Sequence, residues 1–132
     1  MLANGPMLAE VTARIAYALA HPVRVQILEL LRDEGAYVMH LTAILGRPQA
    51  NISQHLAVLR EAGLVEAKRE GMTVIYYVRD PRVFEVIERL EALAESRTET
   101  GMTEFYARLP KVHRMKPGGT RRCRCPRCQA RK

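Results

Sequence analysis

The order of two short helices and a β-hairpin between residues 38 and 79 constrains the fold more than any other feature. Apolar residues recur at helical spacing over 38–45 and again over 48–62, with only a tight connection around Gly46–Gln49 between them. The spacing then changes to about two, and the β-prone run Val74–Val78 follows the turn residues Glu70-Gly71. This order predicts a helix-turn-helix followed by a wing.

The rest of the chain extends this pattern to a complete winged helix-turn-helix. The predicted elements are helices over 7–20, 22–34, 38–45 and 48–62, strands over 64–69 and 72–79, and a last helix that begins after Asp80-Pro81 and weakens after Ser96. The fold class is therefore mainly α with a β-hairpin wing (α+β), in the order ααααββα. We predict a flexible leader over 1–6, a folded domain over 7–110 and a mobile basic tail over 111–132.

The positive charge of the chain lies in that tail. The 132 residues carry a net charge of +7, which suggests a polyanionic partner, but residues 1–110 carry −2 and residues 111–132 carry +9. A domain of this charge can bind DNA only through a few well-placed residues. Apolar runs such as Ile15–Ala20 are too short to span a bilayer, so no membrane partner is expected. Three cysteines within six residues form no disulfide framework, which favours the reducing cytoplasm.

The exposed side of the predicted helix over 48–62 carries groups that can read DNA. At about 100° per residue, Ile52, Leu56 and Leu59 share one side, and amide, hydroxyl and guanidinium groups lie away from it. Such groups hydrogen-bond to base edges and phosphates in a major groove. His55 turns towards the core edge, which favours a structural or phosphate-contacting role. With two wing residues included, the candidate DNA-binding residues are Arg47, Gln49, Asn51, Ser53, Gln54, His55, Lys68 and Arg69.

Several of these segments resemble the ArsR/SmtB family of bacterial and archaeal repressors. The similar stretches are the recognition helix and its continuation over 49–65, the wing over 69–77 and the second helix with its approach over 18–28. The similarity extends from about Leu8 to Leu93. It implies a homodimer built on the first and last helices, bound to double-stranded DNA at an inverted repeat. It also implies a transcriptional repressor that an effector releases from DNA.

The two metal sites best known in that family are expected to be absent from this chain. One uses a Cys-x-Cys pair at the start of the third helix, where this chain has Tyr37–Leu41 without a cysteine. The other uses Asp, His and Glu on the final helix, and Asp80–Ala94 contains neither His nor Cys. We interpret Met39 and His40 as packing and surface residues.

The tail cysteines Cys123, Cys125 and Cys128 are the remaining candidate metal ligands. Thiolates suit As(III), Zn²⁺, Cd²⁺ or Cu(I), and the neighbouring arginines favour the thiolate form. Zn²⁺ would need a fourth ligand, for which His113, a partner-subunit residue or water are candidates. Thiol redox sensing, an isolated zinc site without a sensing role and an incidental role in a phosphate-binding tail remain alternatives.

Three function classes follow from these observations. The first is a sequence-specific, dimeric DNA-binding repressor whose effector is a thiophilic ion or an oxidant. The second is a winged helix that binds proteins and does not read DNA, which the −2 charge of residues 1–110 keeps open. The third is an enzyme, which we do not expect because no Ser/His/Asp triad or paired carboxylates stand out.

Overall fold

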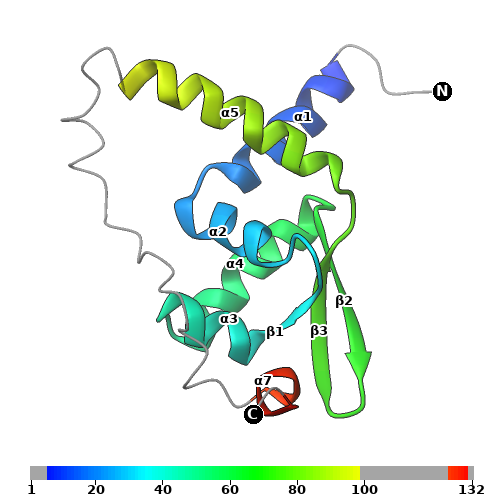
Figure 1. Ribbon diagram of the computed structural model, residues 1–132. Helices are drawn as coiled ribbons and strands as arrows, with labels where there is room; N and C mark the ends of the chain where they lie inside the picture. Colours follow the sequence, from blue (N-terminus) through cyan, green and yellow to red (C-terminus); the bar gives the residue numbers. More distant parts are fainter. Residues whose placement is uncertain (1–5, 99–124, 131–132) are drawn as a thin grey trace.

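The computed structural model describes residues 6–98 and 125–130, which form a mainly helical molecule with one small sheet (Figure 1). The elements are α1 (Pro6–Leu19), α2 (Pro22–Leu30), β1 (Ala36–Tyr37), α3 (Val38–Leu45), α4 (Gln49–Glu61), β2 (Val65–Glu70), β3 (Thr73–Val78), α5 (Arg82–Thr98) and α7 (Pro126–Ala130). The predicted fold class, mainly α with a β-hairpin wing, is confirmed.

The helix-turn-helix is set by the residues between α3 and α4. Gly46 ends α3 in the left-handed region, with φ 63°, and its N–H donates to the Thr42 carbonyl at 2.9 Å. Pro48 then precedes the first residue of α4. Gly63 follows α4 with φ 76°, so a glycine without a Cβ penalty follows each of the two helices.

The sheet has the strand order β1-β3-β2, and both pairings are antiparallel. The predicted wing is the β2–β3 pair, in which Val65 lies opposite Val78 and Glu70 lies opposite Thr73. Strand β1 was not predicted, because two residues are too short to show a period. Gly35 allows this pairing, since a Cβ there would lie 2.7 Å from the Tyr76 carbonyl oxygen.

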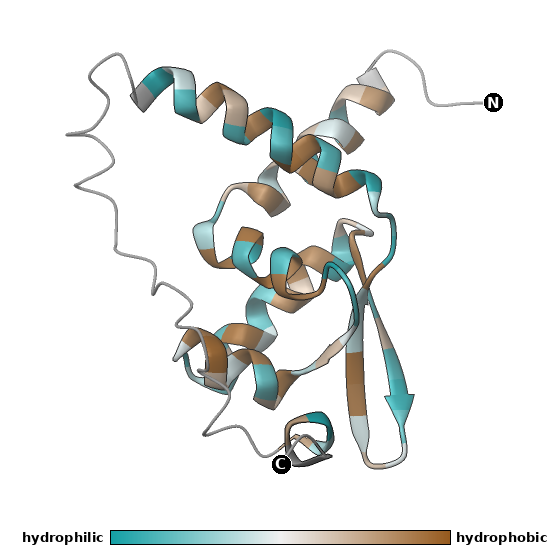
Figure 2. Ribbon diagram, in the orientation of Figure 1, coloured by the Kyte–Doolittle hydropathy of each residue, from teal (hydrophilic) through white to brown (hydrophobic). Residues whose placement is uncertain are grey.

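The hydrophobic core lies where α2, α3 and α4 meet below the first part of α5. Figure 2 shows brown apolar stripes on the sides of these helices that face one another. Leucine, isoleucine and valine supply most of the fully buried side chains, which are Val23, Ile27, Leu28, Leu31, Leu41, Leu45, Ile52, Leu56, Leu59 and Ile87. Within residues 6–98 and 125–130, no helix is both long and apolar enough to cross a membrane.

Residues 125–130 were predicted as part of a mobile tail, but in the structure they include a short helix that packs against the domain. Helix α7 lies below α3 and β1 in Figure 1 and packs against them. Cys125 is fully buried and Cys128 is 9% exposed, both beside Tyr37 and Ile75. The sequence of this segment has no apolar stripe, so no packed helix was predicted. The two cysteines provide its buried contacts with the rest of the molecule. Pro6, predicted as part of the leader over 1–6, is the first residue of α1. Residues 1–5 of that leader and residues 99–124, which include His113 and Cys123, lie outside the described residues.

Candidate DNA-binding surface and thiol cluster

Helix α4 has one buried side and one polar side. Ile52, Leu56 and Leu59 are at most 1% exposed, as their spacing predicts. Arg47 and Asn51 are half-buried, and the Arg47 guanidinium donates to the Asn51 amide oxygen at 3.4 Å. The remaining candidates on the polar side are exposed, namely Gln49, Ser53 and Gln54.

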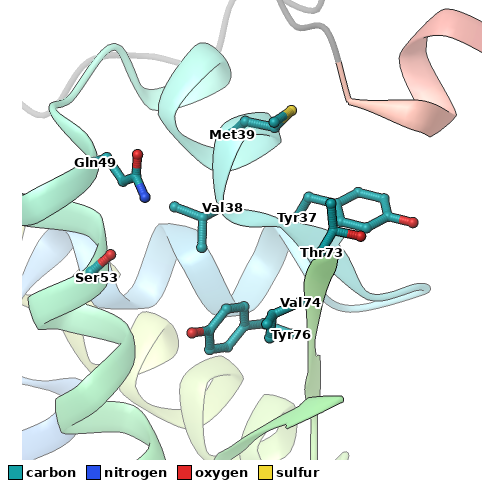
Figure 3. A pocket seen from close by; sticks show the side chains of 8 residues that line it. All are labelled: Tyr37, Val38, Met39, Gln49, Ser53, Thr73, Val74 and Tyr76. Carbon is teal, nitrogen blue, oxygen red and sulfur yellow. The ribbon is translucent and has the colours of Figure 1, made fainter. Parts of the chain in front are cut away.

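A groove of about 300 Å³ separates the polar side of α4 from the wing (Figure 3). Ser53 and Gln49 lie on its α4 side, and Tyr76 of β3 points across it. The start of α3 closes the groove through Tyr37, Val38 and Met39. Helix α4 and the wing therefore face each other across this groove.

The wing carries the two basic candidates on its outer strand. Lys68 and Arg69 are exposed on β2, opposite Ile75 and Val74 of β3. At the wing tip the Tyr37 hydroxyl donates to the Glu70 carboxylate at 3.0 Å. This hydrogen bond, with a smaller contribution from burial, raises the pKa of Tyr37. The wing tip is thus held to the residue that precedes α3.

The structure places the His55 imidazole in the interior, 9% exposed, and not on the polar side of α4. Its Nδ1 lies 3.4 Å from a guanidinium nitrogen of Arg24, and its ring centre lies 4.4 Å from that of His21. Arg24 also donates to the Ala18 carbonyl at 2.8 Å and the Tyr17 carbonyl at 3.1 Å, at the C-terminal end of α1. His55 therefore belongs to a buried polar cluster that joins α1, α2 and α4.

The charge state of His55 follows from that surrounding. Burial, followed by the positive charges of His21, Arg24 and Arg47, lowers the pKa of His55 to about 4. The ring is therefore neutral at pH 7, and its Nδ1 can accept from the Arg24 guanidinium. A buried, neutral imidazole is a poor phosphate ligand, so His55 is not among the DNA contacts proposed below.

A second cluster lies on the opposite side of the helix-turn-helix, between α3 and α7. His40 Nδ1 is 3.3 Å from Cys128 Sγ and 3.8 Å from Cys125 Sγ. One ligand atom from each of the three residues lies within 4.8 Å of the other two. We call this set the thiol cluster; its donor atoms could hold a soft or borderline metal ion.

Arg127 anchors α7 beside the thiol cluster. Its guanidinium donates to the Gly35 carbonyl, lies 3.6 Å from a Glu34 carboxylate oxygen and is 5.9 Å from the centre of the Tyr37 ring. A residue of the basic tail therefore binds the folded domain, a contact that the sequence did not predict. Tyr37 contacts both this anchor and the wing tip.

Sequence reasoning selected two of the three residues of the thiol cluster and set the third aside. Cys125 and Cys128 were candidate ligands, whereas His40 was interpreted with Met39 as a packing or surface residue. The separation of 85 residues between His40 and Cys125 hides the pairing from any local pattern. Met39 does line the groove and is 45% exposed.

Comparison with known proteins agrees with this architecture. The family model described as "Bacterial regulatory protein, arsR family" matches residues 21–67. An HTH-type transcriptional regulator of Methanocaldococcus jannaschii is 40% identical over 85 residues, which are 64% of this chain and 96% of that protein. The chain belongs to the ArsR family. It is thus a member of a family of transcriptional regulators, in line with the resemblance noted in the sequence.

Two further proteins similar to this ArsR-family regulator are a named repressor and a solved DNA-binding domain. The HTH-type transcriptional repressor SmtB of Mycobacterium tuberculosis is 38% identical over 79 residues, which are 60% of this chain and 57% of that protein. A homodimeric winged helix-turn-helix DNA-binding domain of Mycobacterium bovis, solved by NMR, is similar with a TM-score of 0.64 and 29% identity. That similarity covers 76% of this chain and 95% of the other.

Proposed function

We propose that this ArsR-family regulator is a homodimeric repressor that binds an inverted-repeat operator through α4 and the wing. The observation that carries the proposal is the exposed polar side of α4 beside a wing with two exposed basic residues. The name of the M. tuberculosis relative, a transcriptional repressor, supports the direction of regulation. Binding of an effector would weaken the complex with DNA and permit transcription.

The polar residues of α4 divide into base and phosphate contacts. Gln54 and Asn51 carry amides, which pair with the edge of adenine in the major groove. Arg47 lies at the N-terminal end of α4, where guanine or a phosphate is within reach of a guanidinium. Gln49 and Ser53 line the groove towards the wing and suit phosphate or edge contacts.

The wing supplies contacts that depend little on sequence. Lys68 and Arg69 extend from β2 into solvent, where DNA phosphates can pair with them. Each such contact releases counterions, so affinity should fall as salt rises. Because residues 1–110 carry a net charge of −2, these few positive charges are important for binding to DNA.

Helices α1 and α5 supply the proposed dimer interface. They cross at one end of the molecule in Figure 1, and both expose large apolar side chains. Six apolar residues of the two helices are 44% to 63% exposed, namely Met7, Leu8, Val11, Val86, Leu90 and Leu93. A second copy of the chain would cover this surface. The homodimeric state of the M. bovis relative supports a dimer.

The thiol cluster is the proposed effector site. A thiophilic ion bound by the tail cysteines would act next to Tyr37, which reaches the wing tip through Glu70. A change at the cluster can therefore alter the position of the wing without contacting DNA. Oxidation of the neighbouring thiols Cys125 and Cys128 is the second candidate signal, and it would remove the same ligands.

A gel-shift assay with the full chain and its own upstream DNA tests the proposal. Gln54→Ala should weaken binding to the preferred sequence by about 1–3 kcal/mol and relax its specificity. Lys68→Ala should weaken binding to all sequences and reduce the slope against salt by about 1. Arg60→Ala, which removes an exposed positive charge from the last turn of α4, away from its N-terminal half, is the matched control and should change neither. A stable dimer that shifts no DNA would instead favour the protein-binding winged helix.

A further inference from the structure

We propose that His40, Cys125 and Cys128 form a mixed imidazole–thiolate site for a divalent ion of the zinc class, Zn²⁺ or Cd²⁺. The site would join the start of the helix-turn-helix to the last helix of the chain. The role of this ion as the effector rests on the proposed function. Metal binding itself does not depend on DNA binding and can be tested separately.

The distances between the donor atoms suit a tetrahedral ion. With Zn–S of about 2.3 Å and Zn–N of about 2.0–2.1 Å, a tetrahedral angle separates the sulfur from the nitrogen by about 3.6 Å. The two separations from His40 Nδ1, 3.3 Å to Cys128 Sγ and 3.8 Å to Cys125 Sγ, lie on either side of this value. The two nitrogen–sulfur separations therefore need to change by only a few tenths of an ångström when an ion binds.

The surroundings of the cluster favour a bound cation. A hollow of about 30 Å³ lies among its residues, and Cys125 is fully buried. A divalent ion would neutralise the charge of the two thiolates that bind it. Arg127, whose guanidinium contacts the Gly35 carbonyl and the Glu34 carboxylate, lies at the edge of this hollow.

The donor set selects among the thiophilic ions. An imidazole together with two thiolates is a typical zinc ligand set, whereas Mg²⁺ and Ca²⁺ prefer oxygen. As(III) is bound through sulfur, so His40 would contribute nothing to its affinity. The participation of His40 therefore separates the zinc class from the metalloid. A water molecule would take the fourth position.

The site would also fix the end of the chain in place. His40 lies in the first turn of α3, and Cys125 and Cys128 follow it in sequence by 85 and 88 residues. Structural metal sites contribute free energy to the folded form that holds their ligands together. Metal binding would therefore stabilise the contact of α7 with β1 and α3, beside the wing.

Metal affinity of the full, reduced chain tests the proposal. Zn²⁺ affinity is measured by competition with a chromogenic chelator, and Co²⁺ is used as a spectroscopic probe of thiolate and imidazole ligation. His40→Ala and His40→Gln should each weaken Zn²⁺ binding by at least about tenfold and shift the visible Co²⁺ bands. Cys125→Ser should reduce the thiolate-to-cobalt charge-transfer band. As(III) affinity should be unchanged in both His40 variants.

Met39→Ala is the matched control, since it removes the exposed, sulfur-containing neighbour of His40 on α3, and it should bind Zn²⁺ as the unmodified chain does. Circular dichroism shows whether each variant is folded. Unchanged Zn²⁺ affinity in folded His40 variants, or an equal loss in Met39→Ala, would overturn the proposal. So would the absence of tight Zn²⁺ binding by the unmodified chain. Loss of DNA binding with intact Zn²⁺ binding would count against the repressor only.

Discussion

Two histidines of the helix-turn-helix lie in clusters of opposite character. His55 of α4 is surrounded by Arg24 and His21, and its pKa is lowered to about 4. His40 of α3 lies between α3 and α7, with its Nδ1 directed at the sulfurs of Cys125 and Cys128. Positive neighbours and hydrogen-bond donors surround the first ring, whereas two thiols lie beside the second.

The difference shows that the neighbours of a histidine decide what it can do. Arg24 uses one lone pair of His55 and repels any cation that would approach it. At His40 the nearby groups are soft donors that would become anionic on metal binding. We therefore assign a structural role to the His55 cluster and a ligand-binding role to the thiol cluster.

The largest effect that would separate the clusters is expected for Arg24→Met. The change removes the donors to the Ala18 and Tyr17 carbonyls and leaves the end of α1 without its cap. The free energy of unfolding should fall by about 3 kcal/mol in urea denaturation at a fixed protein concentration. Arg127→Met, which removes an arginine from the other cluster, should cost much less. Equal losses would contradict the division.

The second-largest effect is expected from acid, which should lower the stability contributed by the His55 cluster. Because the folded state lowers the pKa of His55 from 6.5 to about 4, the unfolded state binds the proton more readily between these values. Stability is therefore complete above pH 6.5 and falls as pH drops towards 4, by at most about 3 kcal/mol. Urea denaturation from pH 7 to pH 4 measures the slope. His55→Gln should flatten it, and a slope that His40→Gln flattens instead would reverse the comparison.

A backbone change beside the thiol cluster should have a moderate effect. In Gly35→Ala the new Cβ would lie 2.7 Å from the Tyr76 carbonyl oxygen, so β1 must shift. We expect a loss of about 2 kcal/mol in stability and weaker Zn²⁺ binding. Gly46→Ala is the control, since its Cβ meets nothing within 4 Å and only its positive φ is unfavourable, at about 1 kcal/mol. Weaker Zn²⁺ binding in both variants would argue against a local effect.

The smallest expected effect concerns communication with the wing. Tyr37→Phe keeps the ring against the cysteines but loses the hydrogen bond to Glu70. Zn²⁺ affinity should be unchanged, while the effect of Zn²⁺ on DNA affinity should shrink by about 1 kcal/mol, or about fivefold. DNA titrations with and without Zn²⁺ measure it. Tyr77→Phe, which loses the 2.8 Å bond to Glu66 on the same hairpin, should leave the effect intact.

Local patterns predicted most of the domain correctly. The helices and the wing depend on apolar spacing and on glycines such as Gly46 and Gly63, and these signals lie within a few residues of one another. Strand β1 was missed because its two residues form a strand only by pairing with β3. The short helix α7 was missed because its composition is that of a basic tail.

The amino-acid sequence alone determined the winged helix-turn-helix, the polar side of α4 and the presence of clustered thiols. Only the tertiary structure decided that His55 lies inside beside Arg24 and that His40 faces Cys125 and Cys128. The reason is physical. Helical and strand periods arise from neighbours along the chain, whereas the charge, burial and ligands of a histidine come from residues distant in sequence that folding brings within a few ångströms.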